Sequence, residues 1–380
     1  MRIGLDGIPL VSPKTGIGHY TFELAQSLAR IAPADEFQLI SPIPFMPSSF
    51  EQNGDLPSNL YKVSAKRRRL WWAVGLPLYV RQSSLSLFHG TNYDIPLWSR
   101  CPTVVTIHDL SLLLYPETHL SRLVRRGRYR LPFMARAATA IITVTDFVKK
   151  EISEHLRVNP AKIVVTPLAP RRKFRPLSPK ETEETRKRLG IEEVFILFVG
   201  TIEPRKNLIT LLRAFAEVMR KTELRAQLVI VGKHGWLMNE TFSHISKDGL
   251  SERIKFTGYI SDEDLCSLYS SCVVCVYPSL YEGFGLPPLE AMACGAPVIT
   301  SNIPSIVETT GTAAHLVPPM DVQHLAQGIV ELIQDKDKRA YLSRGGLQRA
   351  SQFTWERTAQ LTLDVYRETL KARNHRPGGI

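Results

Sequence analysis

The part of the sequence that most constrains the fold is residues 277–290, YPSLYEGFGLPPLE. It follows an apolar run, residues 273–276, that predicts a buried strand. Its two glycines predict a tight turn. Its adjacent prolines, Pro287 and Pro288, suit the first turn of a helix, where a missing backbone N–H costs nothing. The stretch therefore predicts a strand, a glycine turn and a helix start, with a carboxylate on each side of the turn.

A helix start of this kind can bind an anion, because free backbone N–H groups point at the ligand and glycines let it come close. Glu290, early in the expected helix, can accept hydrogen bonds from two adjacent hydroxyls, as carboxylates do with ribose in nucleotide folds. Glu282, across the turn, then meets the other end of the ligand. Ribose, a diphosphate and further hydroxyls together describe a nucleotide-sugar. The alternative for either glutamate alone is a solvated residue that stabilises the helix start.

The same stretch resembles the signature of the retaining glycosyltransferases of family four, which is Glu, seven residues and Glu after a proline-containing strand end. Glu282 and Glu290 have this spacing. The flanking residues 283–287, GFGLP, and 291–298, AMACGAPV, also match the family pattern. The resemblance implies that the turn lines the donor site through Gly283, Phe284, Gly285 and Leu286.

Length and composition narrow the class of protein. A chain of 380 residues suggests two domains, and a hydrophobic fraction of 44% is enough for ordinary globular cores. No segment approaches the roughly 20 uninterrupted apolar residues of a membrane span, and no signal peptide is visible. The five cysteines lack framework spacing, which points to a reducing compartment and a cytoplasmic location. Cys272 and Cys275 form a CxxC, but their place in or beside a buried strand predicts core packing rather than redox chemistry.

The net charge of +12 is unevenly distributed along the chain. Residues 1–175 hold 24 Lys and Arg against 12 Asp and Glu, so the whole excess lies in the first half. Basic clusters occur at residues 66–69, followed by Trp71 and Trp72, and at residues 122–130. Basic residues beside tryptophans predict peripheral contact with an anionic membrane surface, or an anionic acceptor. A solvated face and nucleic acid are the alternatives, and no nucleic-acid motif accompanies the clusters.

The first half alternates strands and helices, which predicts a parallel sheet covered on both faces. The expected strands are residues 1–6, 38–40, 85–89, 103–108 and 140–144, and the expected helices are residues 19–30, 121–136 and 147–156. Ligands bind beyond the carboxyl ends of such strands, where His89 and His108 lie. His108, followed by Asp109, also matches the family's His-Asp position near the reacting sugar. His89 and Asp109 are acceptor-side candidates, and the alternative for each histidine is a structural role.

The first strand is followed by a loop over residues 9–17 that contains prolines and glycines. A Gly-x-Gly at this position is weak evidence for a dinucleotide fold when taken alone. The resemblance implies that Gly16 and Gly18 face the donor phosphates or the acceptor. The long gap between the first strand and the first helix departs from a Rossmann phosphate loop.

The second half repeats the alternation. The expected strands are residues 195–199, 227–231, 254–256, 273–276 and 298–300, and the last expected helices are residues 322–334, 338–351 and 354–372. After the first of these strands, Gly200 permits close backbone approach, and Arg205 and Lys206 at a helix start suit a diphosphate. The family has the same spacing, which implies a diphosphate clamp; a solvated pair is the alternative. Lys233 and Tyr259 lie at the same strand ends and are candidates for contact with the base or phosphates.

A linker is expected at residues 167–179, which hold four prolines and four basic residues without periodicity. The resemblance implies the α/β fold called GT-B, with two Rossmann-like, doubly wound parallel-sheet domains facing a deep interdomain cleft. Residues 1–170 would form the acceptor-binding domain and residues 171–353 the nucleotide-sugar donor-binding domain. The last helix, at about residues 354–373, would pack back on the first domain.

The activity implied by the resemblance is transfer of a hexose from a nucleotide-diphosphate sugar to a hydroxyl, with retention of the anomeric configuration. The acceptor would be a saccharide or lipid-linked saccharide. The sequence looks closest to bacterial mannosyl- and rhamnosyltransferases of polysaccharide synthesis, so GDP-mannose is the expected donor. No cofactor and no metal are expected, because we recognise no cluster with metal-ligand spacing. The expected catalytic residues are His108, Glu282, Arg205 and Lys206, the last two stabilising the leaving diphosphate.

Two other classes of protein stay open at this stage. One is another GT-B enzyme, such as a sugar-nucleotide epimerase or a phosphorylase, although no pyridoxal-lysine context is discernible. The other is a non-enzymatic basic module for membrane or nucleic acid, which leaves Glu282, Glu290, Arg205 and Lys206 unexplained. The expected partners are therefore a nucleotide-sugar, a saccharide or lipid-linked acceptor and an anionic membrane surface, with no nucleic acid.

Overall fold

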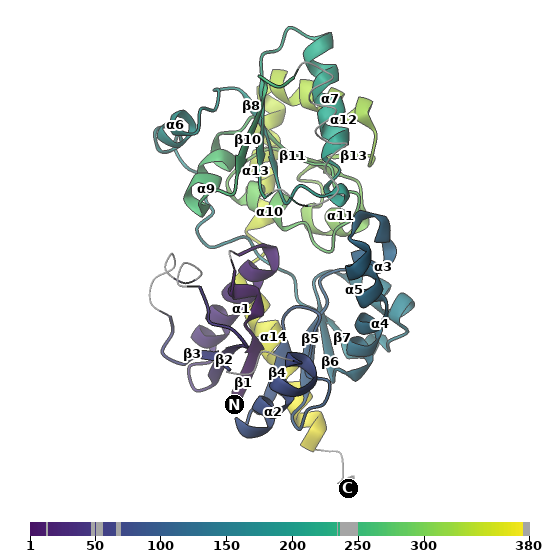
Figure 1. Cartoon of the computed structure of the whole chain (residues 1–380). Helices are drawn as coiled ribbons and strands as arrows, with labels where there is room; N and C mark the ends of the chain where they lie inside the picture. The colour runs from purple at the N-terminus through teal and green to yellow at the C-terminus, as the bar shows by residue number, and fades with distance from the viewer. Residues whose placement is uncertain are drawn as a thin grey trace. The chain divides into compact units, whose positions relative to one another are not determined.

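The computed structural model of the chain describes residues 1–12, 14–46, 50, 56–65, 70–233, 235 and 250–374. It divides into two compact units, each built on its own sheet (Figure 1). Unit 1 contains Met1–Leu110, Arg125–Leu168 and the chain from Thr354 onward. Unit 2 contains Ser111–Val124 and Ala169–Phe353. The short segment Ser111–Val124 was expected in the first domain; it groups with unit 2, where the ring of Tyr115 lies 4.8 Å from that of Tyr281.

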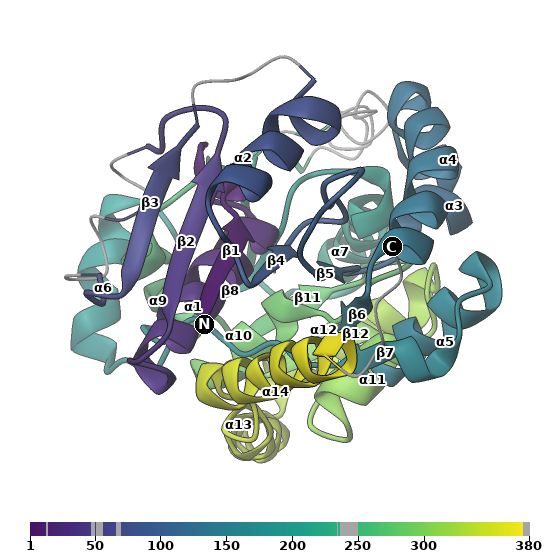
Figure 2. The same ribbon diagram turned by 90° about the horizontal axis from the view of Figure 1, so that it is seen from below.

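The sheet of unit 1 has the strand order β3-β2-β1-β4-β5-β6-β7, and each neighbouring pair is parallel (Figure 2). The strands are β1 (Arg2–Asp6), β2 (Glu36–Ser41), β3 (Leu60–Ser64), β4 (Leu87–Gly90), β5 (Thr103–Thr106), β6 (Ala140–Thr143) and β7 (Ile163–Val165). The order changes direction between β1 and β4. This is the switch point at which open α/β sheets bind ligands, beyond the carboxyl ends of the strands.

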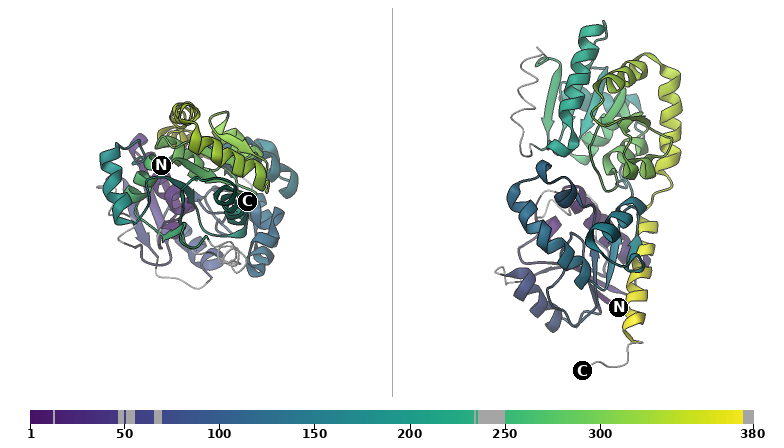
Figure 3. Two further views of the ribbon diagram at one scale, coloured as in Figure 1. Left: turned by 90° about the horizontal axis from the view of Figure 1, so that it is seen from above. Right: turned by 90° about the vertical axis from the view of Figure 1, so that its right-hand side faces the viewer.

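Helices cover both faces of this sheet. They are α1 (Gly16–Ile31), α2 (Leu76–Gln82), α4 (Ser121–Ala137), α5 (Asp146–Leu156) and α14 (Trp355–Asn374); the short α3 (Ser111–Leu114) groups with unit 2. The last helix, α14, packs against α1 within unit 1, and the right-hand view of Figure 3 shows it as the yellow helix along that unit. Its Tyr366 is fully buried, and the hydroxyl lies 2.6 Å from Nδ1 of His89.

The sheet of unit 2 has the equivalent order, β10-β9-β8-β11-β12-β13, and is also parallel. The strands are β8 (Phe195–Val199), β9 (Gln227–Val231), β10 (Ile254–Gly258), β11 (Val274–Tyr277), β12 (Val298–Ser301) and β13 (His315–Val317). The helices are α6 (Pro179–Arg188), α7 (Leu208–Lys221), α9 (Asp262–Ser271), α10 (Leu286–Ala293), α11 (Pro304–Thr310), α12 (Val322–Gln334) and α13 (Lys336–Ala350). The switch point of this unit lies between β8 and β11.

Buried apolar residues explain why these strands lie at the centre of each unit. Strands β8 and β9 are buried along their whole length, as expected for a parallel sheet covered on both faces. In unit 2, α7 and α12 pack together over the sheet, with Phe198, Phe215 and Leu325 in one cluster. Cys272 and Cys275 are buried free thiols, so the prediction of core packing for this CxxC is confirmed.

Several elements differ from the expectation. Helix α1 begins at Gly16, so Gly16 and Gly18 lie in its first turn rather than in the preceding loop. The edge strands β3, β7 and β13 were not expected from the sequence. They are short, and the residues of β3 are mostly exposed, so the apolar pattern that marks a strand is weak there.

Candidate active site

The switch point of unit 2 brings two loops together. The loop after β8 ends in a short 3-10 turn, Pro204–Lys206, and the loop after β11 leads through residues 278–285 into α10. The backbone N–H of Leu280 donates to the carbonyl of Arg205 at 2.9 Å. The side chain of Asn207 donates to the carbonyl of Pro278 at 3.0 Å. These bonds fix the two loops side by side.

The two loops hold a buried cluster of charged side chains, which we call the Glu282 cluster: Glu203, Arg205, Lys206, Tyr277 and Glu282. The Nζ atom of Lys206 lies 2.6 Å from Oε1 of Glu282 and 2.7 Å from the hydroxyl of Tyr277. That hydroxyl donates to the same carboxylate oxygen at 3.0 Å. Arg205 lies 3.0 Å from Oε2 of Glu282 and 2.7 Å from Oε1 of Glu203. Both cations are thus oriented by carboxylates before a ligand enters.

Burial and neighbouring charges set the protonation states in the Glu282 cluster. Burial alone would raise the pKa of Glu282, but Arg205 and Lys206 more than offset it and hold the pKa at about 2. Burial, and then the nearby Arg205, lower the pKa of Lys206, while Glu282 acts in the opposite direction. Near neutral pH, Glu282 is therefore a carboxylate that accepts hydrogen bonds, beside cations that favour an anion.

The turn that carries Glu282 is held in shape by α11. Ser305 donates to the carbonyl of Glu282 at 2.5 Å, and Thr309 donates to that of Phe284 at 2.6 Å. Gly285 caps α10 with φ +88°, and a Cβ atom there would meet Cδ1 of Ile306 at 2.2 Å. Glycine is favoured at this position because the backbone is in the left-handed region, and a side chain would also force that of Ile306 to move.

Glu290 lies one turn into α10 and is 2% exposed. Its two carboxylate oxygens each accept a hydrogen bond at 2.7 Å from Arg171, through Nε and Nη2. Nη1 of Arg171 donates to Asp262, the first residue of α9, at 2.6 Å. Burial raises the pKa of Glu290, and Arg171 partly offsets this rise. Unit 2 therefore holds its two signature glutamates in separate ion-paired groups.

The remaining donor-site candidates of unit 2 lie at the ends of the neighbouring strands. Gly200 follows β8, and Gly283 and Phe284 are buried in the turn before Leu286, the first residue of α10. Lys233 follows β9, and its Nζ lies 5.1 Å from the ring centre of Tyr259, which follows β10. Tyr259 is 53% exposed, so its ring offers a face to a ligand.

In unit 1, His108 lies just beyond β5 and is 9% exposed. Its Nε2 lies 2.9 Å from the carbonyl oxygen of Thr91. Because a carbonyl only accepts, Nε2 carries the proton. Burial lowers the pKa of His108, so the ring is neutral near pH 7 and Nδ1 is an acceptor. Asp109 is adjacent, with its backbone N–H 3.2 Å from the hydroxyl of Tyr93.

His89 has a different environment from the one expected of an acceptor-side residue. It has no exposed surface, and its ring nitrogens lie 2.6 Å from the hydroxyl of Tyr366 and 2.7 Å from that of Thr106. Burial, and then the neighbouring His108, lower its pKa to about 3. His89 joins α14 to the sheet, and we assign it a structural role rather than contact with an acceptor.

The structure thus groups Glu282, Arg205 and Lys206, and it places His108, Gly16 and Gly18 in unit 1. Sequence reasoning missed Arg171, Asp262 and Tyr277. Arg171 was hidden among the basic residues of the expected linker, and its ionic partner Glu290 lies 119 residues away. Tyr277 was visible only as a strand end, and its hydroxyl offered no local signal.

The expectation of no metal has to be weighed against two Asp-x-Asp patterns in the sequence, at residues 262–264 and 335–337. Asp262 and Asp264 lie in the first turn of α9, where Arg171 and Arg188 pair with them. Within the described residues, no group of three or more His, Cys, Asp or Glu side chains is arranged to hold a metal ion. Metal independence stays a prediction.

Comparison with known proteins defines the class to which this fold and site belong. The solved structure of sucrose-phosphate synthase from Thermosynechococcus elongatus superposes with a TM-score of 0.77, covering 98% of this chain and 100% of that one at 24% identity. Residues 14–169 match the model described as Glycosyltransferase Family 4, and residues 181–349 match Glycosyl transferases group 1. The protein is therefore a glycosyltransferase with two Rossmann-like units of the GT-B type, and the expectation of two parallel-sheet α/β domains is confirmed.

Relatives extend this match over nearly the whole chain. The O-antigen chain mannosyltransferase B of Escherichia coli is 33% identical over 380 residues, covering 97% of this chain and all of the relative. The serotype-specific mannosyltransferase WbdA of Escherichia coli is 30% identical over 283 residues; the match covers 73% of this chain and 35% of that protein. The chain belongs to glycosyltransferase family 4, which confirms the resemblance drawn from Glu282 and Glu290.

Proposed function

We propose that this protein transfers mannose from GDP-mannose to a hydroxyl of a saccharide or lipid-linked saccharide during synthesis of a cell-surface polysaccharide. The observation that carries this proposal is the Glu282 cluster, where two cations and a carboxylate lie beside the start of α10. The choice of mannose rests on the relative named O-antigen chain mannosyltransferase B. The enzyme acts on the cytoplasmic side, with retention of the anomeric configuration and without a metal.

The cluster offers separate groups to the separate parts of such a donor. The ammonium of Lys206 and the guanidinium of Arg205 stabilise negative charge on the leaving diphosphate. Glu282 stays ionised and accepts hydrogen bonds from hydroxyls of the transferred sugar. A leaving phosphate oxygen takes the acceptor proton in a same-face displacement. His108, neutral with Nδ1 as an acceptor, orients the reacting hydroxyl.

The experiment is a screen of GDP-mannose, GDP-fucose, UDP-glucose, UDP-N-acetylglucosamine and dTDP-rhamnose. Binding is measured as a shift of the thermal midpoint, and slow cleavage to the nucleotide diphosphate as product release. The proposal predicts the largest shift and cleavage with GDP-mannose. Preference for another sugar would correct the donor only, whereas no stabilisation and no cleavage by any of them would refute the function. Release of an epimer of the donor would favour the epimerase alternative.

We further propose that unit 1 associates with an anionic membrane surface through α4. This helix carries six arginines and no acidic residue. From Arg125 onward its outer side is formed by what we call the α4 face: Arg125, Arg128, Tyr129, Phe133 and Arg136. Tyr129 is 76% exposed and Phe133 is 50% exposed. Aromatic side chains among cations are the composition that binds the interface of an anionic bilayer.

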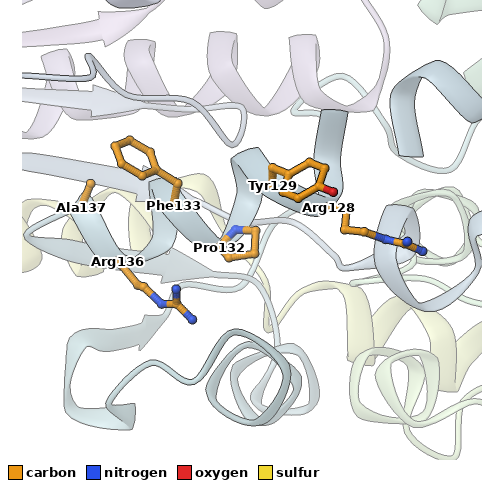
Figure 4. A pocket seen from close by; sticks show the side chains of 6 residues that line it. All are labelled: Arg128, Tyr129, Pro132, Phe133, Arg136 and Ala137. Atoms are coloured by element: carbon orange, nitrogen blue, oxygen red, sulfur yellow. The ribbon is translucent and has the colours of Figure 1, made fainter. Parts of the chain in front are cut away.

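The α4 face is hollowed as well as charged. A hollow of about 510 Å³ is lined by Arg128, Tyr129, Pro132, Phe133, Arg136 and Ala137. Figure 4 shows Arg128 and Arg136 on either side of Pro132, with the aromatic rings of the same helix beside them. Lipid phosphates can meet the arginines while the rings enter the headgroup region. No helix in the described part of the chain is long and apolar enough to cross a bilayer.

The two tryptophans that follow the first basic cluster have different environments in the structure. Trp72 lies near α4, with the guanidinium of Arg130 5.7 Å from its ring centre. Trp71 is 6% exposed and belongs to the core of unit 1, so it is not available to a membrane. The basic residues 66–69, on which the first expectation rested, lie outside the described residues.

Vesicle sedimentation tests this association. The wild-type protein is expected to sediment with vesicles rich in anionic phospholipid at low salt and to be released at high salt. Reversing Arg128 and Arg136 to Glu should abolish sedimentation. Reversing Arg357 and Arg367, exposed on α14, makes the same charge change elsewhere in unit 1 and should reduce it less. Equal loss with both pairs would assign the effect to net charge and not to the α4 face.

A further inference from the structure

The expected mechanism gives Arg171 no role, yet its guanidinium contacts both oxygens of Glu290 and one of Asp262. In the sequence it is the third residue of unit 2 after the boundary at Leu168. Its Nε and Nη2 each lie 2.7 Å from a different oxygen of Glu290. A parallel, two-point contact of this kind fixes the plane of the carboxylate as well as its position.

The orientation of Arg171 is itself fixed from two further directions. Nη1 donates to Asp262 at 2.6 Å, and the guanidinium lies 4.2 Å from the ring centre of Phe174. Arg171 is 9% exposed, Asp262 is 8% exposed and Glu290 is 2% exposed. We call Arg171, Asp262 and Glu290 the bracket, because their contacts join the first turn of α9 to the second turn of α10.

The contact leaves acceptor capacity on Glu290. A carboxylate has about four lone-pair sites, and a two-point contact with a guanidinium uses one on each oxygen. The backbone N–H of Arg171 also donates to this carboxylate, so one acceptor site stays available for a ligand hydroxyl. Without the contacts from Arg171, the carboxylate would rotate, and a ligand hydroxyl would have to order it on binding.

The charge of the bracket restricts the ligand further. One cation faces two carboxylates, so the group carries a net negative charge when both acids are ionised. Neutral hydroxyl donors stabilise that charge, whereas a phosphate at the same place would be repelled. The group is thus suited to a free ribose and unsuited to one that carries a phosphate at this place.

We propose that Arg171 is a positioning residue that presents the carboxylate of Glu290 to the ribose of the nucleotide donor. This inference rests on the proposed function, because it takes a nucleotide diphosphate as the ligand of unit 2. It adds a specificity: discrimination of ribose from deoxyribose depends on a residue that does not itself touch the nucleotide.

The test measures dissociation constants for GDP and for 2′-deoxy-GDP by calorimetry and compares their ratio between variants. The wild type should favour GDP by about ten- to a hundredfold, the loss expected for a hydrogen bond to a charged group. Arg171→Lys keeps the charge but cannot make the two-point contact. In this variant the ratio of the two dissociation constants should fall to within about threefold of unity, mainly because GDP binds more weakly. If both ligands weaken equally and the ratio holds, Arg171 is merely structural and the proposal is overturned.

Two further variants serve as controls for misfolding and for a non-specific loss of affinity. Asp262→Asn removes a charge from the bracket but leaves the contact with Glu290, so the ratio should be kept. If Arg171→Lys fails to fold, the double variant Arg171→Gln with Asp262→Asn replaces it. The double variant removes one charge of each sign and so keeps the net charge. Its ratio of dissociation constants for the two nucleotides should fall toward unity. A wild type that binds GDP without discriminating 2′-deoxy-GDP would overturn the positioning role alone. A wild type that binds no nucleotide diphosphate at all would instead overturn the proposed function.

Discussion

The ammonium of Lys206 lies 2.6 Å from Oε1 of Glu282, and the two residues are separated by 76 positions in the sequence. One precedes α7 and the other precedes α10, so the contact exists only because β8 and β11 are neighbours in the sheet. The parallel sheet therefore assembles a cation and a carboxylate at one place before a ligand binds. Electrostatic stabilisation of this kind is most effective when it needs no rearrangement during the reaction.

Replacing Lys206 tests whether this cation acts on the leaving group. We predict that Lys206→Met lowers the turnover of donor cleavage by roughly 10²–10³-fold, the usual effect of removing one preorganised group that stabilises developing charge. Circular dichroism and the thermal midpoint check that the variant is folded. Turnover within a few-fold of the wild type would assign Lys206 to holding Glu282 and not to the diphosphate.

Chelation tests the metal-free mechanism. We predict that transfer with GDP-mannose continues in excess EDTA, because Arg205 and Lys206 supply the positive charge that a divalent ion would otherwise provide. The measurement is the initial rate before and after dialysis against the chelator. A collapse that magnesium or manganese restores would contradict the prediction.

Gly285 should be irreplaceable for a local reason. Gly285→Ala places a side chain at φ +88° and brings its Cβ to 2.2 Å from Ile306, so we predict a loss of about 2–4 kcal/mol in the free energy of unfolding. Gly345, in α13 of the same unit, has only ordinary contacts around its Cβ position. Gly345→Ala should instead stabilise by about 0.5–1 kcal/mol. Urea unfolding of both variants makes the comparison; equal effects would refute the steric argument.

His89 should make the free energy of unfolding depend on pH. Its pKa in the folded protein is about 3, below the ordinary value of 6.5, so the unfolded chain binds one more proton between those values. The stability from neutral His89 is complete above about pH 6.5 and is lost as the pH falls toward 3, by up to about 1.4 kcal/mol per pH unit. Asp6, whose pKa burial raises to about 7, has the opposite effect in the same unit.

Comparison with His89→Gln separates these contributions, because Asp6 is present in both proteins. We predict that urea midpoints of the wild type fall more between pH 7 and pH 5 than those of the variant. If the urea midpoints of the two proteins change equally with pH, His89 is not the titrating group.

Local signals in the sequence account for the parts of the structure that were predicted well. The turn at Gly285 and the start of α10 follow from glycine and proline preferences, and α12 (Val322–Gln334) has the expected bounds. A threonine before a helix favours capping, and the side chain of Thr145 accepts from the backbone N–H of Val148 at the start of α5. These features depend on residues a few positions apart, whose preferences are readable without tertiary contacts.

Long-range contacts explain what the sequence did not reveal. Arg171 meets Glu290 across 119 residues, and no period or motif links the two positions. His89 looked like a strand-end ligand because its hydrogen-bond partner Tyr366 lies 277 residues away on α14. The local sequence of a histidine at a strand end does not show whether a ligand or a helix from elsewhere in the chain covers it. Only the tertiary structure distinguishes a binding role from a structural one.

The orientation of the donor is tested most directly by comparing Glu282→Gln with Glu290→Gln. Each variant, and the wild type, is titrated with GDP-mannose and with GDP. Glu290 is assigned to the ribose, so its variant should bind both ligands about ten- to a hundredfold more weakly. Glu282 is assigned to the transferred sugar, so its variant should lose affinity for GDP-mannose and turnover while keeping affinity for GDP. Equal weakening of both ligands by Glu282→Gln, or unchanged GDP binding by Glu290→Gln, would contradict the account.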